Sequence, residues 1–276
     1  MRPLFFLSLL APAFVLASEE GVNPKATDLF EIGGIPVSNT ILTTWILTAL
    51  IIIAIRVLVG TPKIVPRKGQ ALVENVASGL RDALEPIVGK KMIGKTFPVL
   101  CGFFVFILLM NWSGLLPGVG TIKYQSADGH WLDAIRPANS DLNTTLALSI
   151  LSFLAWTYFV LRYAGFKALV FDLFGNKADK RELSMLMWLM LGFIFLGVGV
   201  IEVLSIASRL ISLPFRLYGN VFGGENLIHT LGGIAPYVVP AIAGMLEVLV
   251  GLIQAFVFTL LSAVYIGLIC NHDAGH

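Results

Sequence analysis

The sequence predicts an all-α membrane protein with about five membrane-crossing helices and one amphipathic helix on the cytoplasmic side. Three observations support this fold class. Only 13% of the 276 residues are charged and 57% are hydrophobic, whereas a soluble domain has roughly 25% charged and 45 to 50% apolar residues. The apolar residues gather in runs of about 18 residues or more, which is the length that spans a bilayer. Most charged residues lie between these runs, where loops are expected.

The N-terminal segment has the pattern of an export signal. Residues 1–17 carry one positive charge and a short apolar run that ends in a small residue before Ser18, which is typical of a cleavable secretory signal peptide. A short uncleaved anchor is the alternative. Residues 18–38 contain four acidic residues and one lysine, so we expect them outside the membrane in either case. A single integral-membrane domain is expected over residues 39–272.

The first span and the segment after it set the orientation. Residues 39–59 are apolar, and the following stretch is rich in lysine and arginine, which mark the cytoplasmic side. Within residues 68–90, apolar side chains recur at helical spacing opposite a polar face: Leu72, Val76, Leu80 and Leu84. This pattern predicts an amphipathic helix in the membrane interface, because the segment is too polar to span.

Two further spans are predicted over residues 97–116 and 143–163, with an external loop between them. Lysines and arginine follow the third span and indicate the cytoplasmic side again: Lys167, Lys177, Lys180 and Arg181. An external N-terminus and three crossings are therefore mutually consistent.

Residues 183–270 are predicted to form a long, strongly tilted helical hairpin around an external turn at 232–240. A helix over 183–231 would be about 70 Å long at 1.5 Å per residue, whereas the hydrocarbon core is about 30 Å thick. The helix must therefore tilt strongly, kink or lie partly in the membrane plane, and we expect a bend at Pro214. The C-terminus is then cytoplasmic.

Five ionisable residues interrupt the apolar character of this hairpin. Each costs about 2.5 to 3.5 kcal/mol at the bilayer centre on insertion scales, so such residues face a bundle interior, a water-filled cavity or a partner. They are Glu202, Arg209, Arg216, Glu225 and Glu247.

Their spacing predicts a polar stripe on the first helix of the hairpin. Glu202, Arg209 and Arg216 are seven residues apart, which returns them to nearly one helix face. Four polar residues continue or border the stripe: Asn220, Ser205, Ser208 and Ser212. Glu202 and Arg209 fit a structural ion pair as well as a functional path, and the serines fit close packing.

Two carboxylates are predicted at matched depth near the external turn. Glu225 lies seven residues before the turn, on the other side of the helix from Arg216, and Glu247 lies seven residues after the turn. Such a pair can share a proton, and two buried acids at one depth indicate water access. Gln254 shares a helix face with Glu247. Both Gln254 and Asn220 fit either a proton relay or a hydrogen bond between helices.

Other function classes find little support. A formal charge of +2 gives no indication of nucleic-acid binding. The two cysteines, Cys101 and Cys270, have neither CxxC nor Cys/His spacing, so no metal site or disulfide framework is predicted. There is no glycine-rich phosphate loop, and we expect no cofactor and no catalytic site in the chain itself.

Residues 208–231, SRLISLPFRLYGNVFGGENLIHTL, resemble the signature segment of the a subunit of F-type ATP synthases, the membrane stator beside the rotor ring. Four other segments resemble the same family: PRKGQALVENV at 66–76, NWSGLLPG at 111–118, DLNTTLALSI at 141–150 and LIQAFVFTLLSAVYI at 252–266. The resemblance extends over about residues 40–268.

The resemblance implies a role for each candidate residue. Arg216 is expected to be the stator arginine that faces the rotor carboxylate. The ion pathway would include Asn220, Glu225, Glu247 and Gln254, with Asp141 and Asn143 near the external entrance. Glu202 and the serines Ser205, Ser208 and Ser212 would border the cytoplasmic exit. In the family one of the two acid positions is often Gly or His, whereas both are Glu here, so which acid dominates proton entry stays open.

The function implied by the resemblance is that of a proton-conducting stator with two offset half-channels in a rotary ATP synthase. Its expected partners are the rotor ring of c subunits, the peripheral-stalk b subunits, the rest of the complex and membrane lipid, in the bacterial plasma (inner) membrane. Protons are favoured over sodium as the coupling ion. The alternatives are a self-contained proton-coupled carrier for an anionic substrate, disfavoured by the lack of an internal repeat, and a purely structural assembly subunit.

Overall fold

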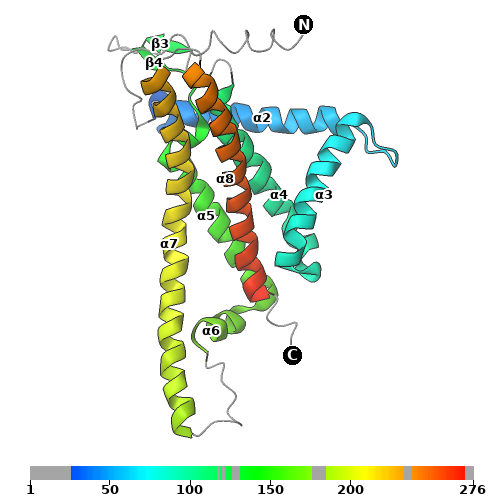
Figure 1. The fold of residues 1–276 in the computed structure, drawn as a ribbon, viewed down its shortest axis with the longest axis vertical. Coiled ribbons are helices and arrows are strands. Elements are labelled where there is room, and N and C mark those ends of the chain that lie inside the picture. Colours follow the sequence, from blue (N-terminus) through cyan, green and yellow to red (C-terminus); the bar gives the residue numbers. More distant parts are fainter. Residues whose placement is uncertain are drawn as a thin grey trace.

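The computed structural model describes residues 26–116, 119, 122–125, 131–175, 185–232 and 238–270. The predicted signal peptide at 1–17, part of the predicted external segment, the centre of the hairpin turn and the C-terminal tail lie outside the described residues. The described part contains five helices that are long and apolar enough to cross a membrane (Figure 1). This confirms the predicted fold class.

The first span and the amphipathic helix meet at a sharp turn. Helix α2 (Asn39–Val59) begins at the N-cap Ser38 and ends at Gly60, whose φ of 57° allows the chain to turn. Helix α3 (Lys68–Val88) then runs crosswise to α2 (Figure 1). The apolar face of α3 is divided between two environments. Leu80 and Leu84 are buried against the other helices, whereas Leu72 and Val76 are 59% and 48% exposed and available to lipid.

The second span begins earlier than predicted, whereas the third span lies within one residue of its predicted bounds. Helix α4 (Lys90–Trp112) starts earlier than predicted, directly after Gly89, and continues as a 3₁₀ turn, η2 (Ser113–Leu115). Helix α5 (Leu142–Phe159) is preceded by the 3₁₀ turn η3 (Ala138–Ser140) and followed by a π-helical turn, η4 (Val160–Ala164). A short helix that was not predicted, α6 (Phe166–Phe174), follows.

The long hairpin consists of α7 (Met185–Gly232) and α8 (Val238–Cys270), which contact each other. Helix α7 has 48 residues, which makes it about 72 Å long at 1.5 Å per residue. Figure 1 shows α2 running crosswise to both helices. When α2 stands upright in a bilayer, α7 and α8 therefore lie at a low angle to the membrane plane. In that orientation the depth that they span does not exceed the thickness of the membrane.

Helix α7 is continuous through Pro214, the position at which a bend was predicted. Proline has no N–H, so the carbonyl of Leu210, four residues earlier, loses its usual helical donor. The hydroxyl of Ser149 on α5 donates to this carbonyl oxygen at 3.0 Å. The replacement donor explains why α7 stays continuous there, since freed backbone groups in membrane helices must be satisfied by neighbours.

Two short hairpins add strands to the otherwise helical fold. The first pairs β1 (Asp28–Ile32) with β2 (Ile35–Ser38), and the second pairs β3 (Lys123–Gln125) with β4 (Trp131–Asp133), both antiparallel. Gly33 and Gly34 link β1 and β2 with φ of 60° and 83°, which suits a two-residue hairpin turn. The sequence analysis did not predict either hairpin.

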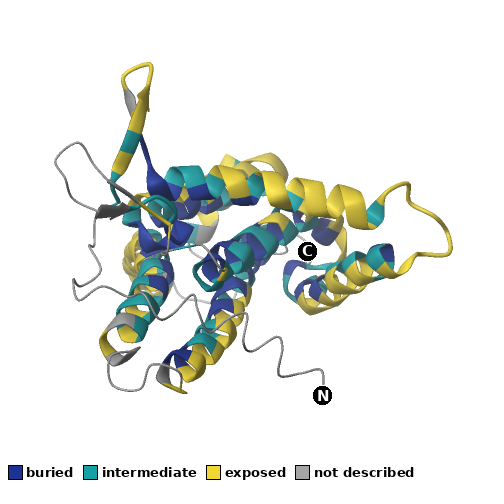
Figure 2. Ribbon diagram, turned by 90° about the horizontal axis from the view of Figure 1, so that it is seen from above, coloured by how far each residue is buried: buried dark blue, intermediate teal, exposed yellow. Residues whose placement is uncertain are grey.

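The main apolar core lies between α3, α4, α5 and α8, with one contribution from α7. Helix α8 packs most extensively against α4. The largest fully buried side chains include Phe258, Leu84, Ile93, Leu100 and Ile107. Figure 2 shows buried residues on the facing sides of these helices and exposed residues along their outer sides.

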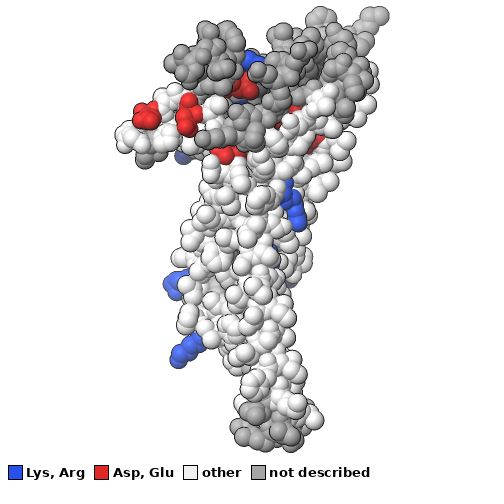
Figure 3. All heavy atoms as spheres, turned by 90° about the vertical axis from the view of Figure 1, so that its left-hand side faces the viewer, with Lys and Arg blue, Asp and Glu red and all other residues white. Residues whose placement is uncertain are grey.

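The exposed surface of the long helices is apolar, as a lipid-facing surface should be. Large exposed apolar residues on α7 include Phe193, Ile201, Leu204, Ile211 and Phe215. Figure 3 shows acidic side chains gathered at one end of the molecule and a long body with few charges. A charge within this body is therefore an exception that needs an explanation.

Candidate functional site

Buried polar side chains gather where the start of α2 meets the end of α4 and the turn before α5. We call this group the polar cluster. Its members are at most 7% exposed: Ser38, Asn39, Thr40, Thr43, Asn111, Ser113, Arg136, Asn139, Ser140, Asp141 and Thr145. Buried polar atoms need hydrogen-bond partners. Water can therefore enter this part of an otherwise apolar protein and bind to the clustered polar side chains.

Asp141 and Asn143, the predicted entrance residues, lie at this cluster. The Asp141 carboxylate caps α5 by accepting a hydrogen bond from the Asn143 N–H at 3.0 Å. Its other oxygen accepts from the Thr40 hydroxyl at 3.2 Å. Asp141 is thus held by structural hydrogen bonds on both oxygens, while the side chain of Asn143 is exposed.

A chain of amide and indole groups connects the polar cluster to α8. The Asn139 amide donates to the Asn111 side-chain oxygen at 2.7 Å, and the Asn111 amide donates to the carbonyl of Gly251 at 3.0 Å. The Trp112 indole N–H donates to the carbonyl of Val248 at 3.0 Å. These bonds fix α8 against the end of α4 directly beside Glu247.

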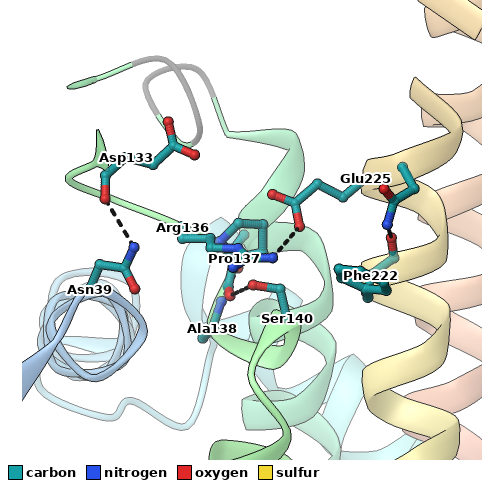
Figure 4. Close-up of polar contacts among 10 residues, drawn as sticks. Asn39, Asp133, Arg136, Pro137, Ala138, Ser140, Phe222 and Glu225 are labelled. Carbon is teal, nitrogen blue, oxygen red and sulfur yellow. Dashed lines mark hydrogen bonds and ion pairs between the residues drawn. The ribbon is translucent and has the colours of Figure 1, made fainter. Parts of the chain in front are cut away.

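Arg136 and Glu225 form a buried ion pair between the turn before α5 and the last third of α7. Arg136 Nη2 lies 3.3 Å from Glu225 Oε2, and the two side chains are 4% and 14% exposed. Figure 4 shows the Arg136 and Glu225 side chains reaching toward each other across the gap between the two segments. Arg136 lies in the loop that was predicted to be external, between the second and third spans.

Glu247 on α8 lies beside this ion pair, in a space left by two glycines. A Cβ atom at Gly224 would be 3.2 Å from the Glu247 carboxyl carbon, and a Cβ atom at Gly114 would be 3.5 Å from Glu247 Oε1. Glu225 is near enough for its charge to act on Glu247. The structure therefore brings together the two acids, and side chains at either glycine would crowd them.

Asn220 and Gln254 connect α7 to α8 on the way from the acids to Arg216. The Asn220 amide donates to Gln254 Oε1 at 3.2 Å, and Gln254 is buried. Asn220 lies one helical turn from Arg216, and Gln254 lies two turns from Glu247. The pair makes the interhelical hydrogen bond that was one of its two predicted roles.

Arg216 points out of the bundle. It is exposed on the apolar surface of α7 and forms no hydrogen bond or ion pair with any residue that the structure describes. Gly219 and Gly223, which are also exposed, continue the same surface, and a Cβ atom at either would meet open space. A flat strip of small residues beside an arginine allows another helix to approach closely.

A second polar region lies between α5, α7 and α8, on the other side of Arg216 along α7. Ser152 and Ser262 share a hydrogen bond of 2.9 Å in a cavity of about 50 Å³, which has room for more than one water molecule. The other polar lining groups are Ser149, Arg209 and Tyr265. Sequence analysis missed the three serines on α5 and α8, since single serines in apolar helices do not stand out.

Arg209 closes one side of this cavity through three interactions. Its guanidinium carbon lies 3.3 Å from the centre of the Tyr265 ring, an arrangement that is stabilising for a cation over an aromatic face. Arg209 Nη2 donates to the Ser205 hydroxyl at 2.8 Å and lies 3.5 Å from Glu202 Oε1. The Glu202–Arg209 ion pair, one of the two predicted readings, is thus present.

The remaining predicted serines lie outside the cavity. Ser208 and Ser212 are exposed on α7, and the Ser208 hydroxyl donates to the carbonyl of Ser205 at 2.9 Å. No group of acidic, histidine or cysteine side chains in the described part of the chain is arranged to hold a metal ion.

The fold and these sites define a multi-span membrane protein with two polar regions inside the bundle and one exposed arginine between them. Along α7, Arg209 and Glu225 lie about 10 Å and about 13 Å from Arg216 at 1.5 Å per residue. Such an arrangement suits the movement of an ion to and from a partner that faces the arginine.

Comparison with known proteins gives the family. The ATP synthase A chain family matches residues 41–267. ATP synthase subunit a of Moorella thermoacetica is 30% identical over 253 residues, which are 91% of this chain and 98% of that protein. ATP synthase subunit a of Geotalea daltonii is 33% identical over 83% of this chain and 86% of that protein. ATP synthase subunit a 2 of a Bradyrhizobium species is 29% identical over 88% of this chain and 93% of that protein.

The chain therefore belongs to the ATP synthase A chain family, the proton-conducting stator subunits of the Fo membrane sector. As a subunit a it is part of an ATP synthase complex. The resemblance predicted from the sequence is confirmed.

Proposed function

We propose that this chain couples proton flow to the rotation of an adjacent ring of c subunits, through two offset half-channels that are separated by Arg216. The observation that carries the proposal is the exposure of Arg216 on an apolar membrane-facing surface. An arginine facing lipid is costly, so this surface needs a partner with a carboxylate. A ring carboxylate in the membrane supplies such a partner for each passing subunit.

The chemistry of arginine suits a stator rather than a relay. The guanidinium group keeps its charge at every accessible pH, so it does not pass a proton on. It stabilises the deprotonated carboxylate of the ring where that group crosses the low-dielectric interface. The same fixed charge opposes direct proton leakage between the two polar regions.

The two polar regions support the two half-channels. Protons would enter from outside through the polar cluster, pass Glu225 and Glu247, and reach the ring near Asn220 and Gln254. After nearly a full rotation they would leave through the cavity lined by Ser149, Ser152 and Ser262, past Glu202 and Ser205, to the cytoplasm. Ser208 and Ser212 lie on the exposed surface of α7 beside this exit.

The proposed orientation places the N-terminus outside and the C-terminus in the cytoplasm of a bacterial plasma membrane, with residues 1–17 removed as a signal peptide. The positive charges after the first and third spans support this orientation. The exposed apolar half of α3 would rest in the cytoplasmic interface. The ring of c subunits would face α7, and peripheral-stalk b subunits are further proposed partners.

We predict that Gly223→Leu blocks docking of the ring while the chain still folds. A Cβ atom at Gly223 meets open space within the described chain, so we expect the added side chain to obstruct a docked partner rather than this chain. We expect the amount of ring that co-purifies to fall at least about tenfold, because small residues are what allow such close helix contact. Gly102→Leu is the control, since Gly102 is also exposed, in open space, and on α4. Normal ring recovery with Gly223→Leu would contradict the proposed interface.

We predict that Ser152→Leu obstructs the proposed exit path. The larger side chain would fill much of the cavity of about 50 Å³ and remove the hydrogen bond to Ser262. ATP-driven proton pumping is expected to fall about tenfold or more, because a dry apolar constriction excludes water. Ser152→Ala, which keeps the space open, should retain most of the pumping. Equal pumping by the wild type and Ser152→Leu would place the exit elsewhere.

Reconstitution separates the stator from a self-contained carrier. The purified chain alone in proteoliposomes should show no substrate-coupled proton flux, whereas the same chain within the whole complex should show ATP-driven proton pumping. Proton flux that depends on an added anionic substrate and needs no ring would overturn the proposal.

A further inference from the structure

We propose that Arg136 is a positioning residue that holds Glu225 as a fixed anion, so that Glu247 is the acid that carries protons through the entrance. This inference rests on the proposed function, and it assigns different roles to two carboxylates that look alike in the sequence. It also assigns a role in the site to an arginine that lies 89 residues from Glu225 along the chain.

The ion pair is built as a fixed element. Arg136 is 4% exposed, and its Nη2 lies 3.3 Å from Glu225 Oε2. The turn that presents Arg136 is held by the Ser140 hydroxyl, which donates to the carbonyl of Pro137 at 2.7 Å (Figure 4). The Ala138 N–H donates to the Ser113 hydroxyl at 3.3 Å, which ties this turn to the end of α4. Arg136 therefore has little freedom to leave Glu225.

Glu247 is placed differently. It forms no hydrogen bond or ion pair with the residues that the structure describes, and its carboxyl group lies against the glycines Gly114 and Gly224. The two glycines themselves place no side chain against the carboxylate. Glu247 can therefore change its rotamer and its hydrogen-bond partners as it gains and loses a proton.

The charges at the site support the same division of roles. Arg136 and Glu225 together are neutral, so the group of Arg136, Glu225 and Glu247 has no net charge when Glu247 is protonated and one negative charge when it is not. A proton from water in the polar cluster binds the Glu247 carboxylate and gives a neutral acid. Transfer of that proton to a ring carboxylate restores the Glu247 carboxylate. Glu225 stays a carboxylate throughout, because the buried guanidinium would otherwise lose its counter-charge.

The test uses single and double neutral variants in the whole ATP synthase. Arg136→Gln removes the guanidinium that pairs with Glu225 beside Glu247, and Glu225→Gln removes the carboxylate that pairs with the buried arginine. Each is expected to lower passive proton flux through the membrane sector at least about tenfold, whereas Arg136→Gln combined with Glu225→Gln should recover flux to within about threefold of the wild type. Glu247→Gln should abolish flux in every one of these backgrounds.

Infrared difference spectra provide a readout that a merely structural role would not change. The component of the protonated-carboxyl band on acidification that Glu247→Gln removes should persist in the Arg136→Gln, Glu225→Gln double variant, because the ring carboxylates contribute equally to both spectra. The charge-reversed pair Arg136→Glu with Glu225→Arg, which keeps an ion pair in the same place, should also recover flux relative to its two single variants.

A matched control is available on the surface. Arg81 and Glu85 form an ion pair of 3.8 Å on α3 with side chains 52% and 30% exposed. Neutralising either one should leave flux unchanged, because exposed pairs contribute little.

Three outcomes would overturn the proposal: a double variant as inactive as the single variants, flux that survives Glu247→Gln, or a carboxyl band lost with Glu225 and kept without Glu247. The stator role is tested separately by Arg216→Ala. If Arg216 stays essential while any of these outcomes is found, only the division of roles between the two acids fails.

Discussion

Arg216→Ala is expected to reduce ATP-driven proton pumping at least about 100-fold, to the background of the membrane. The variant removes the exposed charge that lies beside Gly219 and Gly223 on the apolar surface of α7, so a deprotonated ring carboxylate loses its counter-ion in a medium where charges are costly. Pumping would be measured in inverted membrane vesicles that contain the whole complex. ATP hydrolysis by the same vesicles would show whether the catalytic sector is still attached.

Two variants make this result interpretable. Arg216→Lys keeps a positive charge, but lysine loses its proton more readily when buried and lacks the forked geometry of arginine, so we expect only a small part of the pumping to return. Arg56→Ala removes an exposed arginine from the last turn of α2 and should pump normally. Full pumping by Arg216→Ala would favour the purely structural subunit over the stator.

Gly267→Leu is expected to destabilise the whole bundle. A Cβ atom at Gly267 on α8 would collide with the carbonyl oxygen of Ile87 on α3 and lie 3.3 Å from the Cα atom of Val88. The obstacle is backbone rather than a flexible side chain, so α3 and α8 must separate. Overpacking costs about 1 to 3 kcal/mol when side chains can adjust, and we expect the upper end of that range or more. The midpoint of thermal unfolding in detergent and the amount of chain in the membrane should both fall.

The control for this prediction is again Gly102→Leu, because a Cβ atom at Gly102 on α4 meets open space. Gly267→Ala is a graded test, since a single methyl group should already lower the midpoint. An unfolding midpoint for Gly267→Leu equal to that of the wild type would mean that α3 is not packed on α8 at this position.

The membrane-spanning architecture was predictable because hydropathy and positive charge depend on composition along the chain alone. The long hairpin followed from the length of its apolar segments, and the five candidate spans appear in the structure near their predicted positions. Boundaries were less predictable. Helix α4 begins before its apolar run because Gly89, with a φ of 87°, ends α3 and starts the next helix directly.

The site was only partly predictable, because its missing members are defined by contacts between distant segments. Glu225 and Glu247 were conspicuous as acids in apolar helices, whereas Arg136 resembled an ordinary loop charge until the fold placed it against Glu225. Ser152 and Ser262 are 110 residues apart, and neither differs in sequence context from a packing serine. The continuous course of α7 through Pro214 could not be predicted for the same reason, since the compensating donor, Ser149, is on another helix.

The hydrogen bond from Ser149 to the carbonyl of Leu210 links the order of synthesis to the assembly of α7. Helix α5 precedes α7 in synthesis, so the hydroxyl of Ser149 is already in the membrane when the proline-containing turn arrives and needs it. Arg216 lies two residues beyond Pro214, and its position on α7 therefore depends partly on a serine that also lines the proposed exit cavity. A homologue that lost this serine would have to realign its arginine by another route, and a transplanted α7 would carry the arginine without the support that positions it.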